Sequence, residues 1–223
     1  MEAIAKSAAL IAAAGSGERL GRGPKAFLEL AGKTLLERVV EATAPAVDEV
    51  IVAVPDGREE QARRLVPAAT VIEGGSSRQE SVLALIGATR AQVVLVHDVA
   101  RPFLERAVTD RVLEAARRCG AATAARTVPD TVVDGSNGMV LDRDRLRTVQ
   151  TPQAFRRDLL LEAHAAAATV GREGTDDASL VRALGHPVEL VAGSPWLFKL
   201  TAPEDLGFAS ALAAAWDALM AEP

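Results

Sequence analysis

The segment Ala12–Lys25, AAAGSGERLGRGPK, contains the residues best suited to hold a phosphate group. It follows a short apolar run, and its four glycines let backbone N–H groups approach a ligand closely and adopt positive φ angles. Arg19 and Lys25 add fixed positive charge to the same stretch. The spacing therefore predicts a phosphate-binding loop made of backbone amides and two cations.

Two common nucleotide-binding patterns do not fit this loop. The dinucleotide pattern G-x-G-x-x-G requires glycine where Leu20 stands, and the Walker A pattern requires Ser or Thr where Ala26 follows Lys25. The alternative to a phosphate site is an ordinary glycine loop with solvated charges. A phosphate-binding loop of another class fits the pattern better.

A second candidate is LVHDVARP, residues Leu95–Pro102, in which an apolar strand ends at an acid. Parallel sheets place their ligands at the carboxyl ends of strands, so Asp98 is suited to a divalent metal or a hydroxyl group. Arg101 is suited to a phosphate, which a guanidinium binds through two hydrogen bonds. Alternatively, Asp98 caps the next helix and pairs with Arg101, and His97 is interpreted as structural.

The stretch EGGSSRQESV follows another predicted strand and begins a helix. Gly74, Gly75 and Ser76 can present backbone groups to a base or sugar. Ser77 is better explained as the residue that caps the helix. Ser81 is predicted to face either the ligand or the helix packing.

Three late fragments, TPQAF, GTDDASL and FKLTAPEDL, contain further polar residues. Lys199 lies in an apolar, strand-like run, where a lysine is costly to bury unless it meets an anion. Thr175 and Asp176 either cap a helix or contribute to a site. Three other residues with reactive side chains lack partners at catalytic or metal-binding spacing and are interpreted as structural: Cys119, His164 and His186.

Short apolar runs alternate with segments of helical periodicity along most of the chain. This alternation predicts an α/β fold, a Rossmann-like doubly wound and mostly parallel sheet in one domain over residues 1–223. Residues 126–153 depart from this alternation and contain two β-like runs around the turn DGSNG. Because an isolated two-stranded ribbon is marginally stable, this arm (residues 126–150) is predicted to pack on another subunit.

The bulk properties exclude several classes of protein. A net charge of −5 argues against a nucleic-acid or membrane-surface protein. No stretch approaches the roughly 18–20 apolar residues of a membrane span, and the N-terminal run is too short and too acidic for a signal peptide. A single cysteine suits a reducing compartment, so a cytoplasmic location is predicted.

The fragments AAAGSGERLGRGPKAF, EGGSSRQESV, VHDVARPF, TPQAF, TDDAS and KLTAPEDL, in this order, resemble the 2-C-methyl-D-erythritol 4-phosphate cytidylyltransferase family. The resemblance implies a homodimeric nucleotidyltransferase whose β-arm reaches across to the partner subunit. It also implies a reaction of CTP with methylerythritol 4-phosphate that releases pyrophosphate. Mg²⁺ would be bound mainly through the CTP phosphates, near Asp98, without a dedicated set of protein ligands.

The same resemblance implies roles for individual residues. Arg19 and Lys25 would hold the triphosphate, and Lys25 and Lys199 would stabilise the transition state at the α-phosphoryl group. The nucleotide would be bound by Ala13, Ala14, Gly15, Gly17, Gly75, Ser76 and Ser81. The polyol phosphate would be bound by Asp98, Arg101 and Thr175, together with Arg143 and Thr151 supplied by the partner subunit.

The chain departs from the family pattern at a few positions. Ser76 stands where many members have an acid, Val99 replaces a smaller alanine, and WLFKLT replaces an Asn-Ile-Lys run around Lys199. Three other functions stay open at this point: a ribitol 5-phosphate cytidylyltransferase, a transferase that uses another nucleotide such as GTP, and a non-catalytic nucleotide-binding or oxidoreductase module.

Overall fold

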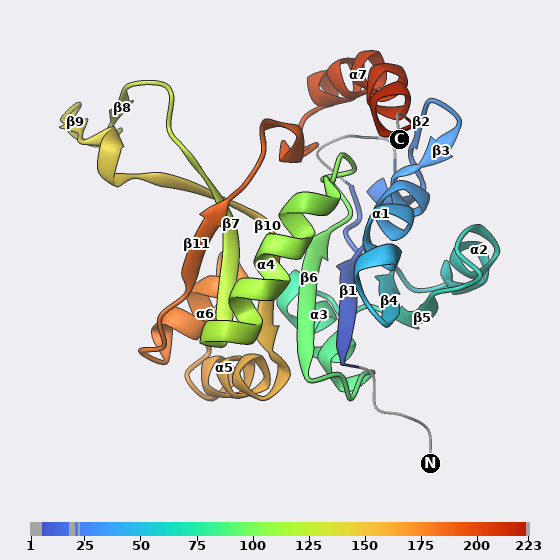
Figure 1. The fold of residues 1–223 in the computed structure, drawn as a ribbon, viewed down its shortest axis with the longest axis horizontal. Coiled ribbons are helices and arrows are strands. Elements are labelled where there is room, and N and C mark those ends of the chain that lie inside the picture. The colour runs from blue at the N-terminus through green and yellow to red at the C-terminus, as the bar shows by residue number, and fades with distance from the viewer. Residues whose placement is uncertain (1–5, 18–20, 22, 222–223) are drawn as a thin grey trace.

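The fold was analysed in a computed structural model that describes residues 6–17, 21 and 23–221 (Figure 1). Its central sheet contains β1 (Ser7–Ala12), β4 (Glu49–Val54), β5 (Thr70–Glu73), β6 (Val93–Asp98), β7 (Ala121–Thr127), β10 (Arg147–Arg156) and β11 (Glu189–Ala192). The strand order is β11-β7-β10-β6-β1-β4-β5, and only β10 is antiparallel to its neighbours. The predicted Rossmann-like, mostly parallel sheet is confirmed.

Seven α-helices cover the two faces of this sheet in the described part of the chain. They are α1 (Leu35–Thr43), α2 (Glu59–Leu65), α3 (Arg78–Gly87), α4 (Arg106–Cys119), α5 (Arg157–Thr169), α6 (Asp177–Ala183) and α7 (Pro203–Ala221). Buried residues of α1, α2, α4 and α7 form one hydrophobic core, whereas those of α3, α5 and α6 form the other. The sheet is therefore the middle layer of three.

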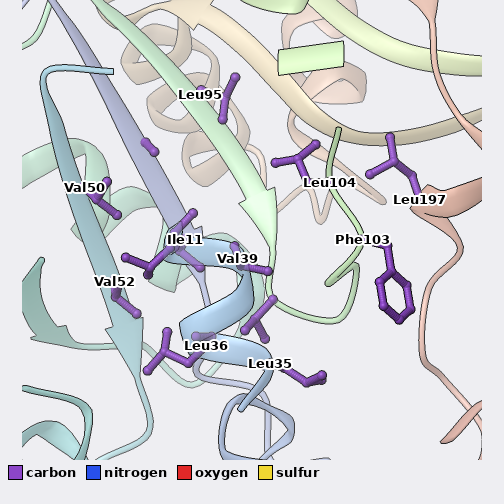
Figure 2. Packing of buried hydrophobic residues seen from close by; sticks show 14 of the residues in the cluster. Ile11, Leu35, Leu36, Val39, Val50, Val52, Leu95, Phe103, Leu104 and Leu197 are labelled. Atoms are coloured by element: carbon purple, nitrogen blue, oxygen red, sulfur yellow. The ribbon is translucent and has the colours of Figure 1, made fainter. Parts of the chain in front are cut away.

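The central strands explain why the sequence shows uninterrupted apolar runs. Ile11 in β1 points into the core of α1, where it lies among residues such as Val39 and Val52 (Figure 2). Its neighbour Leu10 points into the opposite core. Because successive side chains alternate between faces, a strand buried on both sides must be apolar at nearly every position.

The connections place a crevice at the carboxyl ends of β1 and β6. β1 pairs in parallel with both β4 and β6, so the chain leaves β1 toward one side of the sheet and later returns to the other. Ligands of doubly wound folds bind at such a switch in strand order. Ala12 lies opposite Asp98 in the strand register, which brings the start of the glycine segment beside the predicted acid.

A short hairpin interrupts the chain between β7 and β10. Its strands β8 (Val132–Val133) and β9 (Val140–Leu141) pair antiparallel and stand away from the central sheet (Figure 1). Its apolar side chains are exposed, including Met139 at 64% and Val140 at 67%. Its role as a dimerisation arm stays a prediction.

The remaining regular elements are short. They are the pair β2 (Glu29–Leu30) and β3 (Lys33–Thr34), and the 3-10 turns η2 (Lys25–Phe27), η3 (Ala44–Ala46), η4 (Arg143–Arg145) and η5 (Pro195–Leu197). η2 carries Lys25 directly after the glycine segment, and η5 precedes Lys199. Among the helices of the described residues, none is long and apolar enough to cross a membrane.

Candidate active site

A pocket of about 760 Å³ opens at the carboxyl ends of β1, β4, β5 and β6. It is the predicted crevice, and it has polar walls on several sides. Nine of the residues that were expected to bind or act on a nucleotide or its substrate line it: Ala14, Gly15, Gly17, Lys25, Gly75, Ser76, Ser81, Asp98 and Lys199. Segments far apart in the sequence therefore meet at one place.

Two glycines allow the walls of the pocket to come close together. Gly17 has a φ of 73°, and a Cβ atom there would lie 2.0 Å from the carbonyl oxygen of Gly23. A Cβ atom on Gly74 would lie 2.3 Å from the Cβ of Ala14. A side chain at either position would force the backbone apart, so these glycines are needed to shape the loops.

Ser81 holds the second glycine loop in place. Its hydroxyl accepts a hydrogen bond from the N–H of Gly75 at 3.0 Å and donates to the carbonyl of Ser77 at 2.8 Å. The side chain of Glu80 accepts from both the N–H and the hydroxyl of Ser76, at 2.8 and 2.6 Å. The hydroxyl of Ser76 lowers the pKa of the Glu80 carboxyl, so the loop has an ionised acid although Ser76 itself is neutral.

Asp98 is the electrostatic centre of the pocket. One carboxylate oxygen accepts a hydrogen bond from Nε of Arg78 at 2.9 Å, and the other from Nζ of Lys199 at 2.8 Å. Burial alone would raise the pKa of Asp98, but the positive charges of Arg78 and Lys199 outweigh it and hold the pKa below the usual carboxyl range. Asp98 is therefore ionised at neutral pH and fixes Lys199 at the pocket wall.

Arg78 continues this network into the protein interior. Its guanidinium lies 2.8 Å from a carboxylate oxygen of Asp177, whose other oxygen is 3.0 Å from Nε2 of His164. Both Asp177 and His164 are 1% exposed. Burial alone would raise the pKa of Asp177, but the charges and hydrogen bonds of Arg78 and His164 together outweigh it and lower the pKa. Arg78 therefore neutralises two buried carboxylates at once.

The two predicted lysines meet at one short segment near the C-terminus. Nζ of Lys25 donates a hydrogen bond to the carbonyl of Leu200 at 2.7 Å, whereas Lys199 extends to Asp98. Both side chains line the pocket. Their two ammonium groups could neutralise a polyphosphate that enters beside the glycine loop.

Comparison with known proteins identifies the family to which the chain belongs. The family model "IspD: 2-C-methyl-D-erythritol 4-phosphate cytidylyltransferase" matches residues 7–214. The chain belongs to the IspD family. A relative from Thermus thermophilus, named 2-C-methyl-D-erythritol 4-phosphate cytidylyltransferase, is 51% identical over 212 residues, which are 94% of this chain and 98% of the relative.

Further IspD relatives agree with this assignment. A protein of the same name from Deinococcus radiodurans is 52% identical over 210 residues, which are 93% of this chain and 89% of that protein. The crystal structure of the cytidylyltransferase from Thermus thermophilus superimposes with a TM-score of 0.83 at 48% identity, covering 93% of this chain and 98% of that chain. The resemblance seen in the sequence is confirmed.

The IspD resemblance assigns Thr151 to the partner's half of a shared site, and this assignment stays a prediction. Thr151 lies in β10, between β6 and β7 of its own chain, and is 4% exposed. Its hydroxyl accepts a hydrogen bond from the N–H of Asp98 at 3.1 Å. This bond supports Asp98 of the same subunit.

The other predicted IspD site residues that the structure describes do not line the pocket. Ala13 is buried, and its N–H donates to the carbonyl of Ala53 at 2.9 Å. The guanidinium of Arg101 donates to the carbonyl of Leu197, so it holds the segment before Lys199. Thr175 is exposed and precedes Asp176, which caps α6, and Arg143 is exposed on η4. Arg19 lies outside the described residues.

Arg78 and Asp177 are the main site residues that the sequence reasoning missed. A local indication was present: Arg78 is the first residue of α3, where a positive charge opposes the helix dipole. A cation at that position indicates that a nearby anion compensates it. Asp177 follows the capping Asp176, and its burial becomes evident only in the folded chain.

His97, the residue directly before Asp98, is fully buried, and its protonation links the stability of the protein to pH. Its Nε2–H donates to the carbonyl of Arg101 at 3.0 Å, and burial lowers the pKa of His97 to about 4. Below pH 6.5 the unfolded chain protonates His97 while the folded chain does not, so stability decreases as the pH falls. Between pH 7 and 5 we expect this residue to lower the free energy of unfolding by about 2 kcal/mol.

Urea unfolding of the wild type and of His97→Gln at both pH values measures this contribution. The variant should lose less stability on acidification, because glutamine does not titrate. An equal loss in the two proteins would mean that His97 is not kept neutral in the folded state.

Proposed function

We propose that the chain transfers a cytidylyl group from CTP to 2-C-methyl-D-erythritol 4-phosphate and releases pyrophosphate. The observation that supports this most directly is the meeting of Lys25 and Lys199 at one short segment beside the glycine loop. IspD membership supplies the substrates, and the pocket supplies the groups that such a reaction needs. We also propose that the reaction takes place in the cytoplasm.

The reaction joins two anions, which determines what the protein must do. An oxygen of the polyol phosphate forms a bond to the α-phosphorus of CTP. The bond from that phosphorus to the bridging oxygen breaks, and pyrophosphate leaves with the electron pair. Because the nucleophile is already ionised, no base is required, and the barrier is mainly one of charge and orientation.

Different residues would bind the two substrates and stabilise the transition state. The loop around Ala14–Gly17, with Arg19 beyond it, would hold the triphosphate, and Lys25 and Lys199 would stabilise the charge that develops at the α-phosphorus. Gly75, Ser76 and Ser81 would face the nucleoside. Asp98 would lie beside the polyol phosphate, with Arg101 and Thr175 behind it, as the IspD pattern implies.

Mg²⁺ is the cofactor that we propose for this site. Mg²⁺ is usually held by one or two carboxylates together with substrate phosphates and water, and the ionised carboxylate of Asp98 lies at the centre of the pocket. The donor set therefore fits an ion bound mainly through CTP. When bound, the ion would neutralise phosphate charge.

A panel of acceptors tests the proposed substrates. Pyrophosphate release is measured with CTP, Mg²⁺ and either methylerythritol 4-phosphate or ribitol 5-phosphate, and GTP replaces CTP in a parallel series. We expect the highest kcat/KM with CTP and methylerythritol 4-phosphate. Faster turnover of ribitol 5-phosphate, or equal use of GTP, would overturn the proposed specificity.

We further propose a homodimer in which the hairpin contacts the partner subunit and Arg143 contributes to the partner's site. The exposed apolar side chains of β8 and β9 support this, since a free ribbon of this kind is marginally stable. In that arrangement each pocket contains Lys25 from one chain and Arg143 from the other.

Mixing inactive variants tests the shared site. Chains with Lys25→Ala and chains with Arg143→Ala are unfolded together and refolded, which allows heterodimers to form. We expect part of the wild-type activity to return, because one site in each heterodimer is complete. The matched control is a refolded mixture of Lys25→Ala with the double variant Lys25→Ala/Arg143→Ala, in which no site is complete. Activity no higher than in this control would contradict the shared site.

A further inference from the structure

Lys199 lies on an irregular segment, residues 194–200, that connects β11 to α7. Its position therefore depends on whatever holds this segment. On one side the holding groups are polar: the N–H of Leu200 donates to the carbonyl of Ala100 at 2.9 Å, and the side-chain amide of Gln150 donates to the carbonyl of Ser194 at 2.9 Å. These bonds fix the backbone of the segment against the loop after β6 and against β10.

On its other side the segment is held by aromatic rings. Lys199 extends to Asp98, whereas the side chain of its neighbour Phe198 packs among aromatic rings. The ring of Phe198 lies 5.7 Å from Phe103 and 5.2 Å from Phe208, measured between centroids. Trp216 lies 5.5 Å from Phe103 and 5.2 Å from Trp196.

These five rings form an aromatic cluster (Phe103, Trp196, Phe198, Phe208 and Trp216), which includes five of the seven aromatic residues of the chain. Two of them, Phe208 and Trp216, belong to α7. Tilted and edge-to-face ring pairs resist sliding because their contact geometry is specific. The cluster therefore couples the position of α7 to the backbone next to Lys199.

The helix itself is anchored to the rest of the protein. Asp217 accepts two hydrogen bonds from Arg38 of α1, at 2.6 and 3.0 Å, and the side chain of Arg38 is only 4% exposed. At the other end, Asp205 accepts from the N–H groups of Thr201 and Ala202, at 2.6 and 2.8 Å. Arg38 thus ties the C-terminal half of α7 to α1, beside which α7 lies (Figure 1), whereas Asp205 caps the start of the helix locally.

We propose that α7 positions Lys199 through the aromatic cluster, with Trp216 as the central positioning residue. This inference rests on the proposed function, in which Lys199 stabilises the transition state. Trp216 is buried, does not line the pocket and cannot touch a ligand there. Loss of its ring loosens the segment 194–200, so Lys199 spends less time where charge develops at the α-phosphorus.

The test measures kcat and KM for Trp216→Ala with CTP, Mg²⁺ and methylerythritol 4-phosphate. We expect kcat to decrease by about 10- to 100-fold, the effect of displacing a catalytic group by about 1 Å, while the KM for CTP changes little. Trp216→Phe should recover most of the activity, because phenylalanine keeps an aromatic contact. Leu219→Ala, on an exposed part of the same helix, is the matched control and should match the wild type.

A double-mutant cycle separates positioning from general loosening of the fold. On the Lys199→Ala background, Trp216→Ala should cause little further decrease in kcat, because the group that it positions is already absent. An equal decrease on both backgrounds would overturn the inference. If the wild type itself does not use these substrates, the proposed function fails instead, so the two failures are distinguishable.

Phe208→Ala provides a second variant that is less disruptive to folding. This ring is 58% exposed yet contacts Phe198, so its removal leaves most of the core intact. We expect a smaller decrease in kcat than for Trp216→Ala, again absent on the Lys199→Ala background. A folded Phe208→Ala protein with wild-type kcat would contradict coupling through the aromatic cluster.

Discussion

Replacement of Lys25 by alanine is expected to lower kcat by about 100- to 1,000-fold, which corresponds to about 3–4 kcal/mol of transition-state stabilisation. The physical reason is that Lys25 brings a positive charge to the pocket wall at which the triphosphate would lie. Its loss leaves the charge at the α-phosphorus poorly compensated. Steady-state measurement of pyrophosphate release gives the value directly.

Lys33 is the matched control for this prediction. It lies in the same part of the chain but outside the pocket, on β3, where Nζ pairs with Glu41 at 2.6 Å and the side chain is 48% exposed. Lys33→Ala should retain wild-type kcat. Folding should be affected only slightly in Lys25→Ala, since one hydrogen bond to Leu200 contributes about 1 kcal/mol. A folded Lys25→Ala enzyme with unchanged kcat would exclude the proposed electrostatic role.

Replacement of Arg78 by alanine is expected to lower the free energy of unfolding by about 3–5 kcal/mol, because breaking a buried ion pair leaves an uncompensated charge. Here two carboxylates, Asp98 and Asp177, lose the same partner, and both are buried. Urea unfolding at neutral pH measures the loss. Arg106→Ala, which removes an exposed ion pair with Asp110, should change stability by less than about 1 kcal/mol.

The stability difference between Arg78→Ala and the wild type should depend on pH in a definite direction. In the wild type the pKa values of Asp98 and Asp177 lie below the usual range, so these groups stabilise the fold above about pH 4, and this contribution is lost as the pH falls. Without Arg78 their pKa values rise, and the difference between variant and wild type should shrink in acid. A difference that grows on acidification would contradict the assigned network.

Adding Asp177→Asn to Arg78→Ala gives a sharper version of the same test. The second substitution removes one of the two buried carboxylates that lose Arg78, so the double variant should be more stable than Arg78→Ala alone. If the double variant is less stable, the main contribution of Asp177 is its bond to His164.

The fold could be predicted because its strands are buried on both faces. β1 and β6 must be apolar at almost every position, and this makes them visible as runs such as SAALIA and VVLVHD. β10 was not visible as an antiparallel strand in the middle of the sheet. Its sequence RTVQTPQAFR is mixed: the first three residues extend toward the hairpin and are exposed, and several of the buried ones that follow are polar.

The site could be predicted in part for a different reason. Glycine loops and the ends of strands show in local sequence, so Gly17, Gly75 and Asp98 could be placed on one edge of the sheet. The partner of a charged residue depends on tertiary contacts. This is why Arg78 was missed, and why the bond of Thr151 to Asp98 and the bond of Arg101 to Leu197 were not foreseen.

The most direct measurement follows the α-phosphorus of CTP. CTP labelled there with ³²P is incubated with the enzyme, Mg²⁺ and methylerythritol 4-phosphate, and the products are separated. Attack at the α-phosphorus predicts that the label appears in the nucleotide-linked polyol and that the released pyrophosphate is unlabelled. Label recovered in free CMP or CDP, with none joined to the polyol, would contradict cytidylyl transfer in this pocket.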